Sequence, residues 1–388
     1  MRVCAAGAAP TVSLTAMFGF RLICILLAGM AAPAPTADPE SNPVIRIERW
    51  IDGGARVDWS RQGEWLAYDK AGEDGRYDVY VTSTDRLAER CLTCDMYALR
   101  KDNVLNPVWH PAGERLIVQV QSHPKRLKFI ADPLQLLTPD RALHSEFYDI
   151  DRQGKSFTML TRFAANGAAA LDPHFSFDGE RLLWSERIKA RKGRYGAWQL
   201  RSARFQVNRV GAAQLKKITS HPAPADALIV PQGFTPDDRG ALVAANLESG
   251  QSPDTLDLYR LRFDGGEPER LTHSRSGADE YARLSPTGRH LAFTSNAGIR
   301  ATEPDQMVPS SARRELWLMD ADGSHKRRLT FFNDPTSEHS LGHAYVGDLA
   351  WSPRGDQIAV HVLWGGSRNG DRPREALYRI HLDPSFRR

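Results

Sequence analysis

The sequence has few cysteines, no long apolar run and no hydrolase nucleophile motif. Four cysteines occur in 388 residues, and the apolar run at residues 22–28 falls well short of the roughly 20 residues that cross a bilayer. No Gly-x-Ser-x-Gly elbow occurs, which argues against a serine peptidase. The composition is otherwise that of a globular protein, with 41% hydrophobic and 25% charged residues, so the chain needs neither disulfides nor metals to hold a core.

The N-terminal residues 1–31 are predicted to be a signal peptide. Arg21 precedes the apolar run, and the small residues after that run suit cleavage after Ala31, with Ala37 as the alternative. The mature chain would then begin with a linker over residues 32–43, have no transmembrane segment, and be periplasmic or secreted. The exact cleavage site stays open, as do two possible starts: Met1 and Met17.

The charges do not point to a nucleic acid partner. The formal net charge is +4, and the lysines and arginines are scattered along the chain instead of forming the basic stripe that nucleic-acid binding requires. We therefore expect no nucleic acid partner.

A repeated turn motif determines the predicted fold. An aromatic or apolar anchor is followed by Ser, Thr or His and then by a turn glycine, and each turn leads into a short alternating strand. Two further strands and a Leu-Thr or Ile-Thr pair complete most units, which gives four strands per unit. The six anchors are Trp59, Trp109, Phe175, Phe234, Leu284 and Trp351.

Six such units predict an all-β protein, a six-bladed β-propeller of four-stranded antiparallel blades over residues 44–388. A lone four-stranded sheet cannot cover both of its faces, so it must stack on a neighbour. The sixth unit ends without a fourth strand, and residues 43–48 lie where that strand would be needed. We expect this N-terminal strand to complete the last blade and close the ring.

The anchor turns, the terminal Leu-Thr pairs and the stretch Leu-Trp-Leu-Met-Asp-Ala-Asp-Gly at residues 316–323 resemble the propeller repeats of the TolB family. The resemblance covers roughly residues 44–383 and implies a fold more than a function. TolB carries an additional α/β domain before its propeller. Here only the linker separates the signal from the first strand, so we expect that domain to be missing.

Cys91 and Cys94 are the two cysteines that remain after signal removal. Neither the helix that a thioredoxin-like motif needs nor the histidine of a c-type haem site accompanies them. A small structural disulfide or a tolerated unpaired couple is the preferred interpretation, and redox chemistry is the alternative. No cofactor is expected.

The candidate binding residues fall into two groups around the predicted channel. Asp58, His174 and Arg283 directly precede their anchors, so alternation places them on the opposite face, toward the channel. The second group lies in or beside the connections between blades, which we expect to surround the channel mouth: Asp279, Glu280, Glu338, His339, His343 and Asp348. A hydrated polar rim is preferred there, and a metal site at His339 and His343 is the alternative.

These observations favour a monomeric, non-catalytic exported propeller that binds a protein, peptide or glycan through its loop-rich face and channel mouth. The alternative is a metal-dependent polysaccharide lyase or hydrolase acting at the central channel, because the repeats also look similar to those of pectin-fragment lyases. That function would need three or four His or Gln side chains converging on the axis. Catalysis, a bound metal, the identity of the ligand and the biological process stay open.

Overall fold

The structure of the chain is a computed structural model. It describes residues 42–99, 102–121, 145–162, 169–191, 194–221, 227–252, 255–274, 277–299, 313–366 and 373–384. The expected signal peptide lies outside these residues, as does the linker apart from its last two positions. No helix within the described ranges is long and apolar enough to span a membrane.

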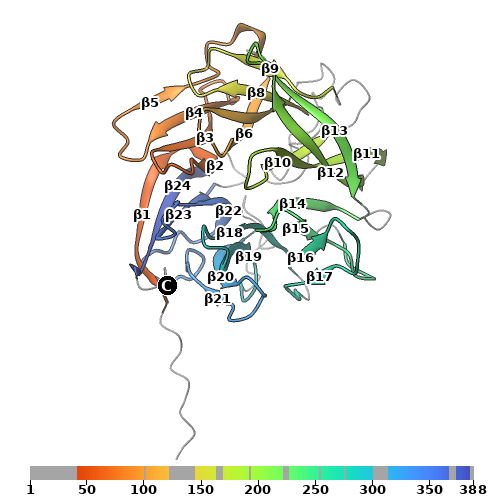
Figure 1. Ribbon diagram of the computed structural model, residues 1–388. Helices are drawn as coiled ribbons and strands as arrows, with labels where there is room; N and C mark the ends of the chain where they lie inside the picture. The colour runs from red at the N-terminus through yellow and green to blue at the C-terminus, as the bar shows by residue number, and fades with distance from the viewer. Residues whose placement is uncertain are drawn as a thin grey trace, which may run out of the picture. The chain divides into compact units, whose positions relative to one another are not determined.

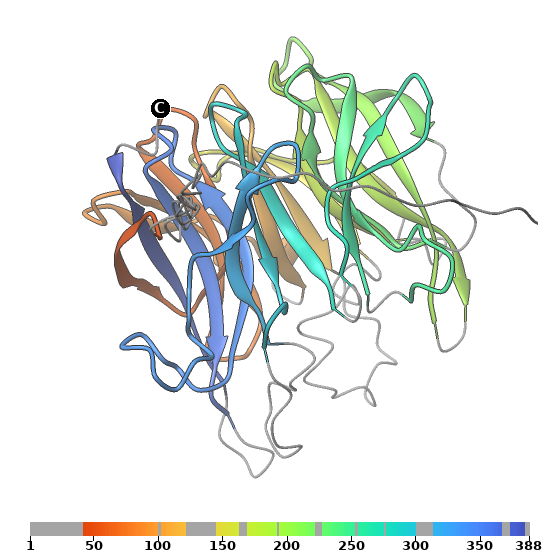
Figure 2. The same cartoon turned by 90° about the horizontal axis from the view of Figure 1, so that it is seen from below.

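The described chain forms six four-stranded antiparallel sheets arranged in a ring (Figure 1), which confirms the predicted all-β, six-bladed propeller. Figure 2 shows strands of neighbouring blades side by side, with connections at both ends. Blade one comprises β2 (Gly54–Trp59), β3 (Trp65–Ala71), β4 (Tyr77–Ser83) and β5 (Glu89–Cys91). Blade two comprises β6 (Asn103–Trp109), β7 (Arg115–Gln121), β8 (Ser145–Asp151) and β9 (Phe157–Met159). Blade three comprises β10 (Ala170–Phe175), β11 (Arg181–Arg191), β12 (Arg194–Val207) and β13 (Ala213–His221). Blade four comprises β14 (Ile229–Phe234), β15 (Gly240–Ala245), β16 (Asp257–Arg262) and β17 (Glu269–Arg270). Blade five comprises β18 (Asp279–Leu284), β19 (His290–Ser295), β20 (Glu315–Asp320) and β21 (Arg327–Arg328). A short 3-10 helix, η1 (Tyr97–Leu99), follows blade one.

The N-terminal strand closes the ring, as the sequence predicts. The sixth blade has the order β22 (Ala344–Trp351), β23 (Gln357–Trp364), β24 (Arg374–Leu382) and β1 (Val44–Asp52). Strand β1 pairs antiparallel with β24 from the Val44 and Leu382 pair to the Asp52 and Ala376 pair. The blade therefore takes its outermost strand from the start of the described chain.

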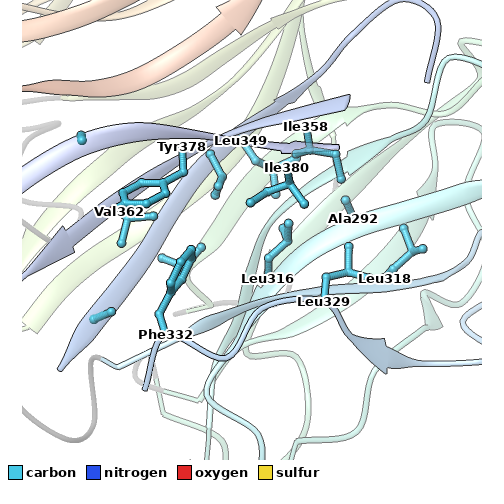
Figure 3. Packing of buried hydrophobic residues seen from close by; sticks show 14 of the residues in the cluster. Ala292, Leu316, Leu318, Leu329, Phe332, Leu349, Ile358, Val362, Tyr378 and Ile380 are labelled. Carbon is cyan, nitrogen blue, oxygen red and sulfur yellow. The ribbon is translucent and has the colours of Figure 1, made fainter. Parts of the chain in front are cut away.

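Neighbouring blades are held together by apolar side chains from facing sheets. Between blades five and six, Leu316, Leu318 and Leu329 lie opposite Ile358 and Ile380 (Figure 3), and all are at most 1% exposed. Complete burial of such a side chain stabilises the fold by about 1.5–3 kcal/mol. Because the same packing recurs around the ring, each blade depends on its two neighbours.

The anchor turns explain why Ser or Thr follows the anchor. The Ser176 hydroxyl accepts a hydrogen bond from the Arg181 amide at 2.9 Å, and Gly179, three residues after Ser176, has a φ of +77°. In the fourth blade the predicted turn glycine, Gly240, is wrong: Asp238 takes the left-handed conformation there, with a φ of +56°. Gly240 serves a different purpose, since a Cβ at that position would lie 2.2 Å from the Leu261 carbonyl oxygen.

The Leu-Thr pairs at the blade ends also have a structural role. The Thr330 hydroxyl accepts a hydrogen bond from the Leu316 amide at 2.9 Å and donates one to the Glu315 carboxylate at 2.6 Å. Blades one, two and four repeat this arrangement. In blade three Thr219 is exposed, and its hydroxyl lies against the Lys217 carbonyl oxygen instead.

Candidate binding site in the central channel

An open cavity of about 370 Å³ lies on the ring axis, at the end where the anchor turns gather. All six innermost strands contribute to its wall. Each contributes its anchor and the residue before that anchor, and these preceding residues are Asp58, Val108, His174, Gly233, Arg283 and Ala350. The structure thus brings together three of the sequence-predicted residues: Asp58, His174 and Arg283.

Register irregularities in the innermost strands shape this wall. Each of these strands contains a bulge or irregularity shortly before its anchor, for example between Leu171 and His174 in β10. The pairing is regular again from His174 to Phe175, so those two side chains point to opposite sides of the sheet. The residue before the anchor therefore faces the channel.

The Asp58 carboxylate is held by two blades. One of its oxygens accepts a hydrogen bond from the Trp59 amide at 3.0 Å, and the other accepts one from the Trp109 amide at 2.7 Å. Burial raises the pKa of Asp58 to about 7, with a smaller upward effect from Asp348, against the opposing effects of these amides and of Arg283. Asp58 therefore changes charge near neutral pH.

His174 and Arg283 have defined partners within the wall. The His174 Nε2 atom lies 3.1 Å from the Pro231 carbonyl oxygen, so Nε2 carries the proton. Burial, followed by the charge of Arg283, lowers the pKa of His174 well below 6.5, so the ring is neutral at pH 7. Arg283 forms an ion pair of 3.0 Å with Asp348, whose other oxygen accepts a hydrogen bond from the Val57 amide at 3.3 Å.

A second polar layer lies deeper in the channel. Arg56 donates a hydrogen bond to Asp172 at 2.9 Å and another to Asn106 at 3.1 Å. The side-chain Nδ2 atom of Asn106 donates a hydrogen bond to the same Asp172 oxygen at 2.8 Å. The Arg56 guanidinium also lies 5.4 Å from the centre of the Tyr281 ring. These contacts cross the axis and link blades one, two, three and five.

Sequence reasoning singled out Asp348 but missed the other members of this deeper layer, although a pattern marks them. Five residues that lie exactly three positions before their anchors are polar or aromatic: Arg56, Asn106, Asp172, Tyr281 and Asp348. In the fourth blade the irregularity is one residue shorter, and Gln232, two positions before its anchor, accepts a hydrogen bond from the Ala282 amide at 2.6 Å. A search for equivalent positions across the repeats would have identified the layer.

Two exposed side chains meet at the cavity mouth and were also missed. Arg61, in the first anchor turn, donates a hydrogen bond to the Phe177 carbonyl oxygen in the third. Its guanidinium lies 5.0 Å from the centre of the Phe177 ring. Both residues line the cavity, so this contact reaches past the second anchor turn along the rim.

The remaining sequence-predicted residues do not join the cavity wall. Asp279 and Glu280 lie at the opposite end of β18 from Arg283; Glu280 pairs with Arg314, and Asp279 accepts a hydrogen bond from Ser274 at 2.8 Å. Asp348 is in β22, behind Arg283. The other three lie in the connection between β21 and β22: Glu338, His339 and His343.

The structure does not gather a metal-ligand set around the predicted histidines. His339 lies 3.5 Å from Glu338, and within the described ranges neither His339 nor His343 belongs to a group of three candidate ligands. The group of three that the described residues do form is Asp78 with Cys91 and Cys94.

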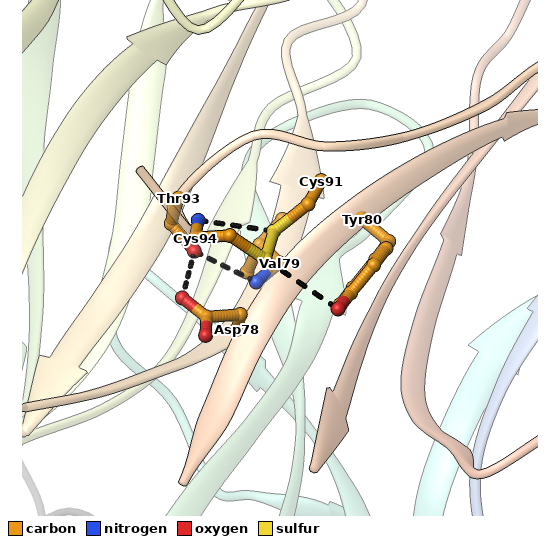
Figure 4. The surroundings of a disulfide bond; sticks show 6 residues. All are labelled: Asp78, Val79, Tyr80, Cys91, Thr93 and Cys94. Carbon is orange, nitrogen blue, oxygen red and sulfur yellow. Dashed lines mark hydrogen bonds between the residues drawn. A yellow bond between two sulfur atoms is a disulfide. The ribbon is translucent and has the colours of Figure 1, made fainter. Parts of the chain in front are cut away.

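Cys91 and Cys94 are joined by a disulfide in the structure (Figure 4). The Cys94 amide lies 3.0 Å from the Cys91 sulfur, and the Tyr80 hydroxyl lies 3.4 Å from the Cys94 sulfur. Asp78 accepts a hydrogen bond from Thr93 at 2.6 Å, the bond expected of a blade-end threonine. In this state the sulfurs are not thiolates, which are the form that binds metals.

Comparison with known proteins bears on the fold. No protein-family model matches the chain, and no curated protein matches its sequence. A protein described as TolB from Agrobacterium tumefaciens is 16% identical, with a TM-score of 0.50, over 85% of this chain and 91% of that one. TolB from Acinetobacter baumannii is 16% identical, with a TM-score of 0.47, over 85% of this chain and 63% of that one. Oligogalacturonate lyase from Vibrio parahaemolyticus is 10% identical, with a TM-score of 0.45, over 88% of this chain and 98% of that one. The likeness is one of fold, and by fold the chain is a TolB-like six-bladed β-propeller.

Proposed function

We propose that the protein is an exported, non-catalytic propeller that binds a segment of a protein or peptide partner in its channel cavity. The observation that carries this proposal is the cavity itself. Its volume of about 370 Å³ falls in the range of ligand sites, and a lining of mostly apolar and aromatic residues with a few polar groups is typical of such sites. The rigid ring supplies walls that need little reorganisation when a ligand binds.

The polar groups of the cavity favour binding over catalysis. Ser285 is the hydroxyl residue among the described lining residues, and its oxygen accepts a hydrogen bond from the His290 amide at 3.2 Å in the anchor turn. His174 is the histidine of the same lining, and its Nε2 proton is bound by a backbone carbonyl. A nucleophile needs a base within hydrogen-bond reach, and these two side chains are committed to other partners.

Export is supported by the sequence and by the cysteine pair. A basic residue, a short apolar run and small residues in that order are typical of a secretory signal. Disulfides persist mainly in oxidising compartments. A periplasmic or secreted location follows from the proposal and is tested by fractionating cells and locating the processed chain.

The test of binding uses peptide display with a cavity-filling variant. Peptides are selected on the purified protein and their affinities are measured for Val108→Trp, which places a large ring in the cavity. Val210→Trp is the matched control because Val210 is 87% exposed and lies in the turn between β12 and β13. We expect at least a tenfold loss with the first variant and no change with the second. Failure to select any peptide, or equal binding by both variants, would overturn the proposal.

A further inference from the structure

Asp58 is the acidic residue of the cavity wall, and within the described residues it forms no ion pair, although the charges of Arg61 and Arg283 act on it from a greater distance. Three charged residues line the wall, since His174 is neutral: Asp58, Arg61 and Arg283. Arg283 is paired with Asp348, and Arg61 is held against Phe177. Within the described residues no cationic nitrogen lies within ion-pair distance of Asp58.

The bonds that Asp58 does make leave it able to accept more. Each carboxylate oxygen accepts one backbone amide, from Trp59 and from Trp109. An ionised carboxylate has about four lone-pair sites, so each oxygen retains capacity for a further donor. Because the two amides belong to different blades, the orientation of the carboxylate is fixed before a ligand arrives.

Aromatic anchors are among the residues that line the cavity around this carboxylate, with their rings on the side of each strand opposite to the residue that faces the channel. Five of the six anchors that line the cavity carry aromatic rings: Trp59, Trp109, Phe175, Phe234 and Trp351. The stems of lysine and arginine side chains pack well on apolar surface. A cationic group therefore finds here a carboxylate without an ion pair, together with apolar lining residues such as Val108 and Ala350.

We infer that the cavity selects a partner segment bearing a cationic group, a lysine or arginine side chain or a chain-terminal ammonium, which pairs with Asp58. This inference rests on the proposed function and names the chemistry that the cavity recognises. An anionic group bound by Arg61 and Arg283 is the opposite outcome, and the experiment separates the two.

The protonation of Asp58 gives the inference a second measurable consequence. Burial holds the pKa of Asp58 near 7, the charged groups that face it are Arg283, Asp348 and Arg61, and His174 is neutral because burial keeps its pKa well below 6.5. A cation pairs with the ionised carboxylate, so its binding releases a proton from any molecule in which Asp58 is protonated. Affinity for a cationic probe should thus rise with pH between pH 6 and 8.

The experiment compares three probes of similar shape: benzylammonium, benzyl alcohol and phenylacetate. Binding to the purified protein is followed by calorimetry and by the fluorescence of the cavity tryptophans. We expect benzylammonium to bind at least tenfold more tightly than benzyl alcohol, and phenylacetate to bind most weakly. Asp58→Asn should abolish the preference, and Asp264→Asn, at an exposed turn, should preserve it.

The outcomes distinguish this inference from the proposed function. Equal or tighter binding of benzyl alcohol or phenylacetate would overturn the cation preference and leave the cavity as a binding site. Absence of binding by all three probes, together with failure of the peptide selection, would overturn both. If Asp58→Asn does not fold, the pH dependence of binding to the wild-type protein still tests the inference. An affinity for benzylammonium that stays constant or falls between pH 6 and 8 would contradict the role of Asp58.

Discussion

The guanidinium of Arg56, in the first blade, lies 2.9 Å from the carboxylate of Asp172, in the third. The two side chains are 14% and 10% exposed, so their charges are largely withdrawn from water. Arg56→Met would leave Asp172 with the Asn106 amide as its remaining side-chain partner. We expect a loss of about 3–5 kcal/mol in the free energy of unfolding, measured by urea denaturation.

The control for this prediction is Arg262→Met, because the ion pair of Arg262 with Asp264 is exposed. Exposed pairs contribute about 0–1 kcal/mol. A loss below about 1 kcal/mol for Arg56→Met would show that the deep layer does not stabilise the ring.

The blade-end threonines offer a comparison within one sequence motif. Thr330→Val removes the hydroxyl that satisfies both the Leu316 amide and Glu315, and leaves them buried. The expected cost is about 1–3 kcal/mol. Thr219→Val, at the equivalent position of blade three, should cost less than about 0.5 kcal/mol because Thr219 is exposed. Similar costs from thermal or urea unfolding would contradict the role assigned to this hydroxyl.

The pKa of Asp58 predicts a pH dependence of stability. The folded protein has a pKa of about 7 at this group, against an ordinary value of 3.8. Between pH 3.8 and about 7 the folded chain holds a proton on Asp58 that the unfolded chain has lost. The contribution of Asp58 to the free energy of unfolding is therefore complete below pH 3.8 and is lost as the pH rises through about 7.

The measurement is the difference in unfolding free energy between the wild type and Asp58→Asn across this range. We expect the wild type to lose stability relative to the variant as pH rises from 4 to 7. Asp149, with a pKa that burial raises to about 6, shifts both proteins equally. A difference that stays constant with pH would show that Asp58 titrates at its ordinary value.

Removal of the disulfide should have a limited effect. Cys91 and Cys94 are three residues apart, and the chain-entropy estimate for so short a loop is about 2 kcal/mol. Replacing both cysteines with alanine should lower the free energy of unfolding by this amount, and reduction of the wild type with dithiothreitol should do the same. A collapse of the fold on reduction would mean that the disulfide organises more than its own turn.

The sequence predicted the architecture because the repeat is marked by short-range chemistry. Turns such as Ser176 to Gly179 use a hydroxyl acceptor and a left-handed residue; the left-handed residue recurs in all six blades and the hydroxyl in five, with His110 in its place in the second blade. Ring closure was predictable because the sixth unit lacks a strand that residues 43–48 can supply. The one misassigned turn position, Gly240, reflects a close backbone approach that one strand alone does not reveal.

The site was predicted in part, for a physical reason. Alternation from the anchor placed Asp58, His174 and Arg283 toward the channel, and all three line the cavity. Connection length drew attention to Glu338 and His339, which lie outside it. The contact of Arg61 with Phe177 depends on how turns from different blades approach one another, and local pattern carries no information on that approach.

The pairing of β1 with β24 gives the ring a single seam. Both ends of the described chain are joined at this seam, since Val44 pairs with Leu382, so trimming either end would open the same sheet and expose a strand edge to other molecules. The joined strands are also the most distant in the chain, and contacts of such separation form slowly. A molecule cut or unfinished at either end would therefore fail in the same way, by opening at the sixth blade, whatever the state of the other five.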